Sequence, residues 1–214
     1  MKKITRLIAL TLICISAHSL TSCLSNDNDS DAKTITHEQA LAYMRQVGGN
    51  YKGKLYFYND TITTTNNKVD SVNIEMSITA NDSNIVVKNI PGRVFSKLFR
   101  GTQYEELRNA IDELPAQELK ARYVFYSVTD AEFIYYGVYP INKTLNVTYG
   151  GKEHKISFNY YSMMNANGQY VRNETAFPLY LQEIRIDNMQ ERLFNTTGTY
   201  VDQDCVLSFR ATRQ

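Results

Sequence analysis

The sequence predicts a mainly antiparallel β domain with two short helices, an α+β arrangement in which the strands close into a β-barrel. A β-sandwich is the alternative. Three observations support this prediction. Apolar residues recur at every second position in several segments. The chain contains 16 Tyr among its 214 residues, and tyrosine favours strands. Hairpin-length links join several neighbouring segments, which is typical of antiparallel barrels.

The chain begins with the pattern of an export leader. A basic start precedes an apolar run over 7–15, which is too short to span a bilayer. The four residues that end at Cys23 resemble the bacterial lipobox, in which the cysteine becomes the first residue of the mature protein and carries the lipid, palmitate included. The resemblance implies a lipid anchor on Cys23 and a location in the cell envelope, at the outer membrane.

The sequence divides into a signal peptide over 1–22, a flexible tether over 23–35 and one β-rich domain over 36–214. The tether is rich in Ser, Asn and Asp, which bury little surface. Its acidic residues are similar to the surface-export signals of Bacteroidetes lipoproteins. Acidic residues also simply make a linker soluble, so the sequence leaves both surface-facing and periplasm-facing positions open.

Charge and cysteine content narrow the function classes. The formal net charge of +1 becomes −2 when the three basic residues of the leader are removed. A nearly neutral mature chain has no electrostatic reason to bind nucleic acid. With Cys23 lipidated, the mature chain offers no internal disulfide, so the hydrophobic core must stabilise the domain.

The first structured element is a predicted helix over 36–47. Thr36 and Gln39 match a capping box, apolar side chains follow at helical spacing, and two glycines supply a stop. The period of the apolar residues then changes to two, which indicates strands. These strands are predicted over 51–58, 71–79 and 85–87.

A second helix is predicted from Thr102, which matches a capping box with Glu105, to a stop at Pro115. The chain then returns to strands. Two of them are each predicted to present one apolar face: Val124, Tyr126 and Val128, followed by Ile134, Tyr136 and Val138.

The last part of the chain is predicted to be a β meander. A hairpin over 145–160 turns at two glycines, and a polar loop follows over 163–175. The apolar parity of the next strand slips by one residue, which predicts a β-bulge near Gln182 and Glu183. A strand over 205–211 then closes the sheet.

The order of these features resembles a known family. A lipobox leader, a short amphipathic helix, a Tyr-Lys-Gly-Lys-Leu strand at 51–55, an Asn-Ile-Pro-Gly segment at 89–92 and a C-terminal meander are similar to a group of Bacteroides-type lipoproteins of unknown function, some with a lipocalin-like domain. The resemblance implies a lipocalin-like or calycin-like barrel and an envelope location. It assigns no functional residues.

Patterns for catalysis and metal binding are weak. His37 and His154 remain after processing, and neither has a second His at helical or strand spacing, so we expect no metal and no cofactor. Cys205 could approach His154 if their strands were neighbours, but it shares a strand face with Leu207, where a thiol acts as a small hydrophobic group. We therefore expect a non-catalytic protein, and a hydrolase that uses His154 is the least favoured alternative.

Tyrosines are the candidate contact residues for a ligand or partner: Tyr56, Tyr58, Tyr135, Tyr136 and Tyr139. They would line both faces of a curved sheet, where they could stack on a sugar or enclose an apolar ligand. The alternative is cross-strand packing with the hydroxyl groups in water. The absence of Trp, which offers the largest stacking surface, counts against a glycan.

Two short segments resemble the acceptor pattern for O-glycosylation in Bacteroides envelope proteins. Thr61 and Ser71 each follow an aspartate and precede an aliphatic residue. The resemblance implies that Thr61 and Ser71 are modification sites.

These observations together predict a lipid-anchored envelope protein that binds a small apolar or amphipathic ligand without transforming it. The alternative is a structural or protein-interaction lipoprotein of the outer membrane. The expected partners are the membrane, through the lipid on Cys23, and a small ligand or another envelope protein. Nucleic acid and metal ions are not expected as partners.

Overall fold

The computed structural model describes residues 35–59, 68–130, 133–161, 167–194 and 205–214, except for the side chains of 126–130. These residues fall within one compact unit. The predicted leader and tether, and with them Cys23, lie outside the described residues, as does Thr61.

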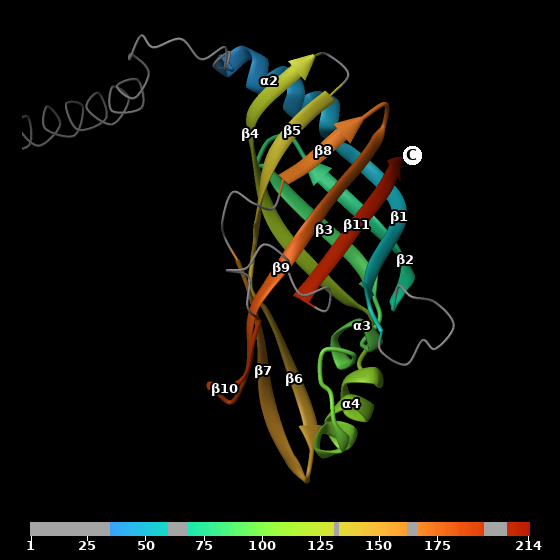
Figure 1. The fold of residues 1–214 in the computed structure, drawn as a ribbon. Coiled ribbons are helices and arrows are strands. Elements are labelled where there is room, and N and C mark those ends of the chain that lie inside the picture. The colour runs from blue at the N-terminus through green and yellow to red at the C-terminus, as the bar shows by residue number, and fades with distance from the viewer. Residues whose placement is uncertain (1–34, 60–67, 131–132, 162–166, 195–204) are drawn as a thin grey trace, which may run out of the picture. The chain divides into compact units, whose positions relative to one another are not determined.

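Eight antiparallel strands close into a barrel, which confirms the predicted barrel over the sandwich (Figure 1). Around the ring they are β1 (Gly49–Tyr58), β2 (Val69–Thr79), β3 (Asn84–Ile90), β4 (Gln117–Asp130), β5 (Phe133–Pro140), β8 (Asn167–Val171), β9 (Glu174–Ile186) and β11 (Val206–Arg213). The C-terminal strand β11 completes the ring because it pairs with both β9 and β1.

The predicted bulge in β9 is confirmed, and it is where this strand leaves the barrel. Tyr160 lies opposite Leu181 and Asn159 lies opposite Glu183, so Gln182 is an extra residue. The carbonyl of Gln182 instead accepts a hydrogen bond from the Phe194 amide at 2.9 Å. Because the bulge shifts the parity by one residue, the apolar residues on both sides of it stay buried.

Beyond the bulge, β9 belongs to a second sheet with β10 (Met189–Leu193), β7 (Lys152–Tyr160) and β6 (Lys143–Tyr149). The predicted hairpin between β6 and β7 is confirmed. Gly150 and Gly151 both have positive φ, and Leu145 lies opposite Ile156. A two-residue turn of this kind matches the twist of the strands that it joins.

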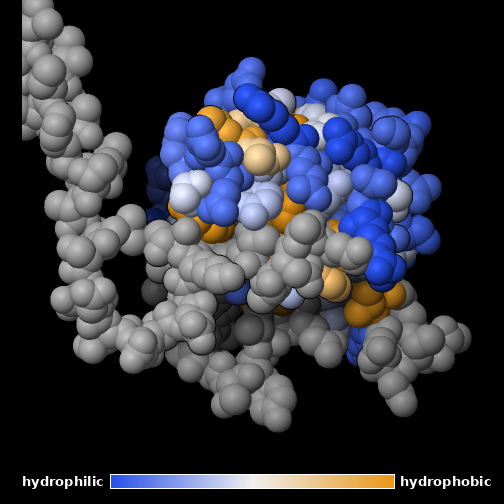
Figure 2. Space-filling model, turned by 90° about the horizontal axis from the view of Figure 1, so that it is seen from above, coloured by the Kyte–Doolittle hydropathy of each residue, from blue (hydrophilic) through white to orange (hydrophobic). Residues whose placement is uncertain are grey.

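The first helix, α2 (His37–Val47), has the predicted capping box. The Thr36 hydroxyl accepts from the Gln39 amide at 3.2 Å, and the Gln39 side chain accepts from the Thr36 amide at 2.9 Å. The last turn of the helix is joined to the barrel because the Tyr51 hydroxyl donates to the Val47 carbonyl. Seen from this end, the described surface is mostly hydrophilic, with separate hydrophobic areas (Figure 2).

Three short helices follow β3: α3 (Arg93–Ser96), the 3-10 helix η1 (Thr102–Tyr104) and α4 (Glu105–Asp112). They pack on the second sheet, where the Phe158 ring lies 5.1 Å from that of Phe95. The capping box predicted at Thr102 is wrong. The 3-10 turn includes Thr102, so α4 begins only at Glu105 and has no side-chain cap. Among the described residues, no helix is long and apolar enough to span a membrane.

Large side chains occupy the barrel interior. Tyr51, Tyr123 and Tyr136 are fully buried, and the rings of Tyr123 and Tyr136 lie 5.9 Å apart. The Tyr123 hydroxyl donates to the Thr79 carbonyl at 3.0 Å. Burial raises the pKa of Tyr123 to about 12. These hydroxyl groups are therefore held by protein acceptors and stay protonated.

Tyr136 needs a glycine opposite it. Its hydroxyl hydrogen-bonds to Thr175, and its ring lies so close to Gly168 that a Cβ at position 168 would overlap it. Gly168 is paired with Tyr136 across β5 and β8. The interior packing thus depends on the absence of a side chain at this point.

Other predictions about the strands were wrong. Val124 is 52% exposed, whereas Tyr123 and Ala121 are buried. Both parities of this segment are apolar, so only the pairing of β4 with β3 and β5 decides its inner face. The predicted loop over 163–175 contains β8 and a tight turn, and β10 was not predicted at all.

Candidate functional site

The five candidate tyrosines do not form one cluster. Tyr136 points into the core, whereas Tyr56 and Tyr58 lie half-buried on the outside of β1. Tyr135 and Tyr139 are half-buried on β5, which is four strands from β1 in either direction around the ring. A single contact surface can therefore include the first pair or the second, but not both.

The pair on β1 has a third tyrosine nearby. Tyr56 and Tyr58 are two residues apart, so they project on the same side about 7 Å from each other. Tyr180 on β9 lies opposite Val206, at the start of β11, the strand between β9 and β1. We call Tyr56, Tyr58 and Tyr180 the tyrosine face. Tyr180 was not predicted as a contact residue, although it alternates with the buried residues Leu179 and Leu181.

Next to the tyrosine face, a row of side chains crosses the outside of the barrel. Four register pairs define it: Gln169 with Ala176, Ala176 with Arg210, Arg210 with Lys54, and Lys54 with Asn73. We call these five residues the basic row. Its centre places two cations directly opposite each other, which puts their Cβ atoms about 5 Å apart.

The two central cations differ in their contacts. Arg210 forms an ion pair with Glu174 at 3.0 Å, and this carboxylate raises the pKa of Arg210. Lys54 is exposed and has no ion pair within the described part of the chain. Like charges directly opposite each other destabilise a sheet. The sheet therefore contains a repulsion between Lys54 and Arg210, and Glu174 neutralises only Arg210.

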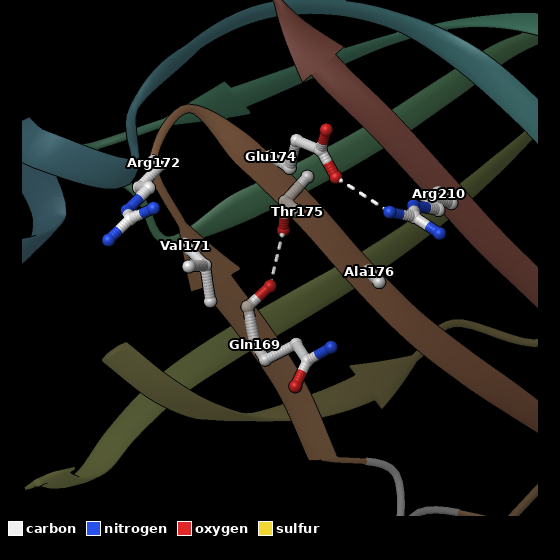
Figure 3. A pocket seen from close by; sticks show the side chains of 7 residues that line it. All are labelled: Gln169, Val171, Arg172, Glu174, Thr175, Ala176 and Arg210. Atoms are coloured by element: carbon white, nitrogen blue, oxygen red, sulfur yellow. Dashed lines mark hydrogen bonds and ion pairs between the residues drawn. The ribbon is translucent and has the colours of Figure 1, made fainter. Parts of the chain in front are cut away.

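A hollow lies on each side of the cation pair. The first has a volume of about 410 Å³ (Figure 3), and in it the Glu174 and Arg210 side chains point toward each other. It is lined by Gln169, Val171, Arg172, Glu174, Thr175, Ala176 and Arg210. The second has a volume of about 600 Å³ and is lined by Lys52, Gly53, Lys54, Asn73, Ile74, Glu75 and Asn89. The first hollow thus presents guanidinium groups and one side-chain amide, and the second presents ammonium groups and two amides, with one carboxylate in each.

A family model described as a domain of unknown function, DUF4840, matches residues 46–186. The chain belongs to the DUF4840 family. No curated protein and no solved structure matches it. The DUF4840 match runs from just before β1 to the end of β9, so Lys54 lies inside it and Arg210 on β11 lies beyond it.

The second sheet of this DUF4840 chain contains a histidine–aspartate pair. His154 Nδ1 lies 2.7 Å from Asp187 Oδ2, and the His154 ring stacks on Tyr149 with centroids 4.1 Å apart. Asp187 also accepts from the Lys155 amide at 2.9 Å, and these two contacts hold its pKa below the usual range. The pair joins β7 to the turn between β9 and β10.

In the described part of the chain, no nucleophile is paired with this histidine. Within the described residues, His154 hydrogen-bonds to Asp187 and not to a hydroxyl or thiol group. Cys205 is fully buried at the start of β11. Across the described ranges, no three metal-ligating side chains come together. The geometry is that of an oriented histidine that fixes a hairpin turn.

The predicted modification sites are only partly described. Ser71 is half-buried on β2 and lies opposite Tyr56, and its amide donates to Asp70 at 2.7 Å. Ser71 is therefore next to the tyrosine face. Cys23 and Thr61 belong to the ranges that are not described.

Proposed function

We propose that this DUF4840 chain is a non-catalytic, lipid-anchored protein of the bacterial outer membrane that binds its ligand on the outside of the barrel. The observation that supports this most strongly is the tyrosine face beside the basic row. Half-buried tyrosines next to exposed cations and amides offer both apolar contact area and hydrogen-bonding groups.

The outer location differs from the enclosed apolar pocket of a lipocalin-like binding protein. Tyr51, Tyr123 and Tyr136 occupy the interior, and their hydroxyl groups are bonded to protein acceptors. An enclosed ligand would have to displace these side chains and leave their hydroxyl groups without partners, which costs free energy. A ligand on the outer face leaves these interior contacts in place, and at Tyr58 it would meet the Arg100 guanidinium, which lies 4.7 Å from the ring centroid.

The lipid anchor is proposed from the lipobox that ends at Cys23. Cys23→Ala should abolish incorporation of labelled palmitate and move the protein from the membrane fraction to the soluble one. A variant that stays in the membrane fraction, together with wild-type protein that takes up no label, would contradict this anchor.

Ligand binding is tested by native mass spectrometry of the chain purified from its own envelope. We expect a bound mass that is lost in the Tyr56→Ala/Tyr58→Ala double variant. Tyr139→Ala on the opposite side of the barrel is the matched control and should retain it. A bound mass that persists in the double variant would place the site elsewhere.

A protein-interaction role is the second candidate, because the edge strand β10 has two exposed apolar side chains. Met189 and Leu193 on β10 are 66% and 65% exposed, and among the described strands β10 pairs only with β9. Open edges of this kind can pair with another chain. Leu193→Asp should abolish any self-association seen by sedimentation velocity, and Leu41→Asp on α2 is the control.

A further inference from the structure

We infer that the basic row binds an acidic glycan, with the anionic group of the glycan held between Lys54 and Arg210. This inference rests on the proposed outer binding face and names the class of ligand that the face would take. Four features of the described residues support it: the facing cations, the surplus of positive charge, the neutral polar groups and the position of Tyr56.

The facing cations are the main argument. Lys54 and Arg210 are paired in register on β1 and β11, at the seam where the barrel closes. A pair of like charges at this position lowers the stability of the sheet. Of the two cations, only Arg210 forms an ion pair with Glu174, so the repulsion is not fully offset. Natural sheets usually avoid like charges at paired positions, and exceptions to such rules are expected at functional sites. An anion between the two cations would remove the repulsion and form charge-assisted hydrogen bonds with both.

The positive charge extends beyond this pair. In the adjacent row, Lys52 is paired with Glu75, and Glu75 is paired with Lys88. The outer surface of β9, β11, β1, β2 and β3 therefore has more exposed cations than exposed carboxylates among the described residues. The cations are Lys52, Lys54, Lys88 and Arg210, and the carboxylates are Glu75 and Glu174. A chain that is nearly neutral as a whole therefore has a locally positive surface here, which favours a polyanion.

The groups around the cations favour sugar rings over other polyanions. The side-chain amides of Gln169 and Asn73 end the row at its two hollows, and Asn89 lines the larger one. Amides can donate to and accept from hydroxyl groups, which sugars present and phosphate backbones largely lack. Each hollow, of about 410 or 600 Å³, lies beside one of the cations. Sugars on both sides of an acidic residue would therefore have a hollow each.

Tyr56 completes the site. It lies opposite Ser208 on β11, two residues before Arg210, and on β1 it lies two residues after Lys54. A tyrosine ring at the edge of the row can pack on the apolar side of a sugar. Because the ring is half-buried, charge and hydrogen bonding must supply most of the affinity. The absence of Trp counts against a glycan held by ring stacking, whereas this face would hold an acidic glycan mainly through charge.

The test is binding of the detergent-purified full chain to an array of neutral glycans and of glycans bearing carboxylate or sulfate groups, with a single-stranded oligonucleotide as a second polyanion. We expect retention of acidic glycans only, with binding that weakens as salt is raised. Retention of neutral glycans, of no glycan, or of the oligonucleotide with equal affinity would overturn the inference. The proposed outer site would survive such a result if native mass spectrometry still showed a bound mass that is lost in the Tyr56→Ala/Tyr58→Ala variant.

Variants then locate the anion. Lys54→Gln should weaken the binding of the best acidic glycan about tenfold, as expected for one charge-assisted hydrogen bond. Glu174→Gln should strengthen it, because Arg210 loses its competing carboxylate. Lys152→Gln, an exposed cation of the second sheet, is the matched control. Unchanged affinity in Lys54→Gln, with an unfolding midpoint at or above that of the wild type, would contradict the assignment.

Discussion

Replacement of Tyr160 by Phe should stabilise the domain. Tyr160 is on β7, beside the bulge of β9, and its side chain is only 4% exposed. Its hydroxyl has no hydrogen-bond partner in the described part of the chain. Burial raises the pKa of Tyr160, so the group remains a neutral donor. By contrast, the hydroxyl of Tyr136, equally buried, hydrogen-bonds to Thr175.

The expected magnitude follows from this difference. A buried polar group without a partner costs about 1–3 kcal/mol, whereas a satisfied neutral hydrogen bond contributes about 1 kcal/mol. Tyr160→Phe should therefore raise the free energy of unfolding by about 1–3 kcal/mol. Tyr136→Phe should lower it by about 1 kcal/mol, because Thr175 keeps its bond to the Gln169 carbonyl at 3.2 Å. In a domain of this size each kcal/mol shifts Tm by about 2–4 °C.

The assay is thermal and urea unfolding of both variants, followed by far-UV circular dichroism. The variants remove the same atom from two equally buried tyrosines, so differences in ring packing largely cancel. A fall in Tm for Tyr160→Phe as large as that for Tyr136→Phe would refute the argument. It would show that the Tyr160 hydroxyl is satisfied in the protein.

Three further results are expected. Gly168→Ala should lower stability by about 1–3 kcal/mol in urea unfolding because its Cβ would overlap Tyr136, whereas Gly137→Ala, with ordinary contacts, should cost less. Because burial raises the pKa of Tyr136 and the other core tyrosines, their contribution to stability should be lost as pH rises above 10, and phenolate absorbance should then appear together with unfolding. Because the pKa of Asp187 is lowered in the folded protein, the contribution of Asp187 to stability is present above pH 3.8 and is lost as pH falls further. Asp187→Asn should therefore reduce the loss of stability at acidic pH in a series of unfolding curves.

Local pattern was sufficient for much of the fold. The capping box at Thr36, the glycine turn at 150–151 and the parity slip at Gln182 each involve residues close in sequence, and all three were predicted. Their physics is local, since a cap, a turn and a bulge are each defined by a few neighbouring residues. The second sheet could not be inferred from the bulge, because it depends on the pairing of β7 with β9, in which Ile156 lies opposite the distant Ile186.

Other features escaped the pattern because nonlocal packing decides them. β8 contains a glycine, and the turn after it is formed by Arg172 and Asn173 at φ 48° and 71°. This composition is typical of a polar loop. Only the contact between the Tyr136 ring and Gly168 explains why the segment is a strand. Arg-Asn is a weaker turn signal than Asn-Gly. The tyrosine face was half-predicted for a related reason. Tyr56 was identified by its type, whereas Tyr180 belongs to the same face only through the pairing of β9 with β11.

The proposed site lies where the barrel closes, and this position has a physical consequence. β11 pairs with both β1 and β9, and these two pairings complete the ring. Arg210 thus lies opposite Lys54 across a pairing of residues more than 150 positions apart in sequence. The unfolded chain does not hold the two cations together, so an anion that requires both binds only the closed barrel. Ligand binding and closure of the barrel must therefore be thermodynamically linked, and the ligand stabilises the seam that the two cations weaken.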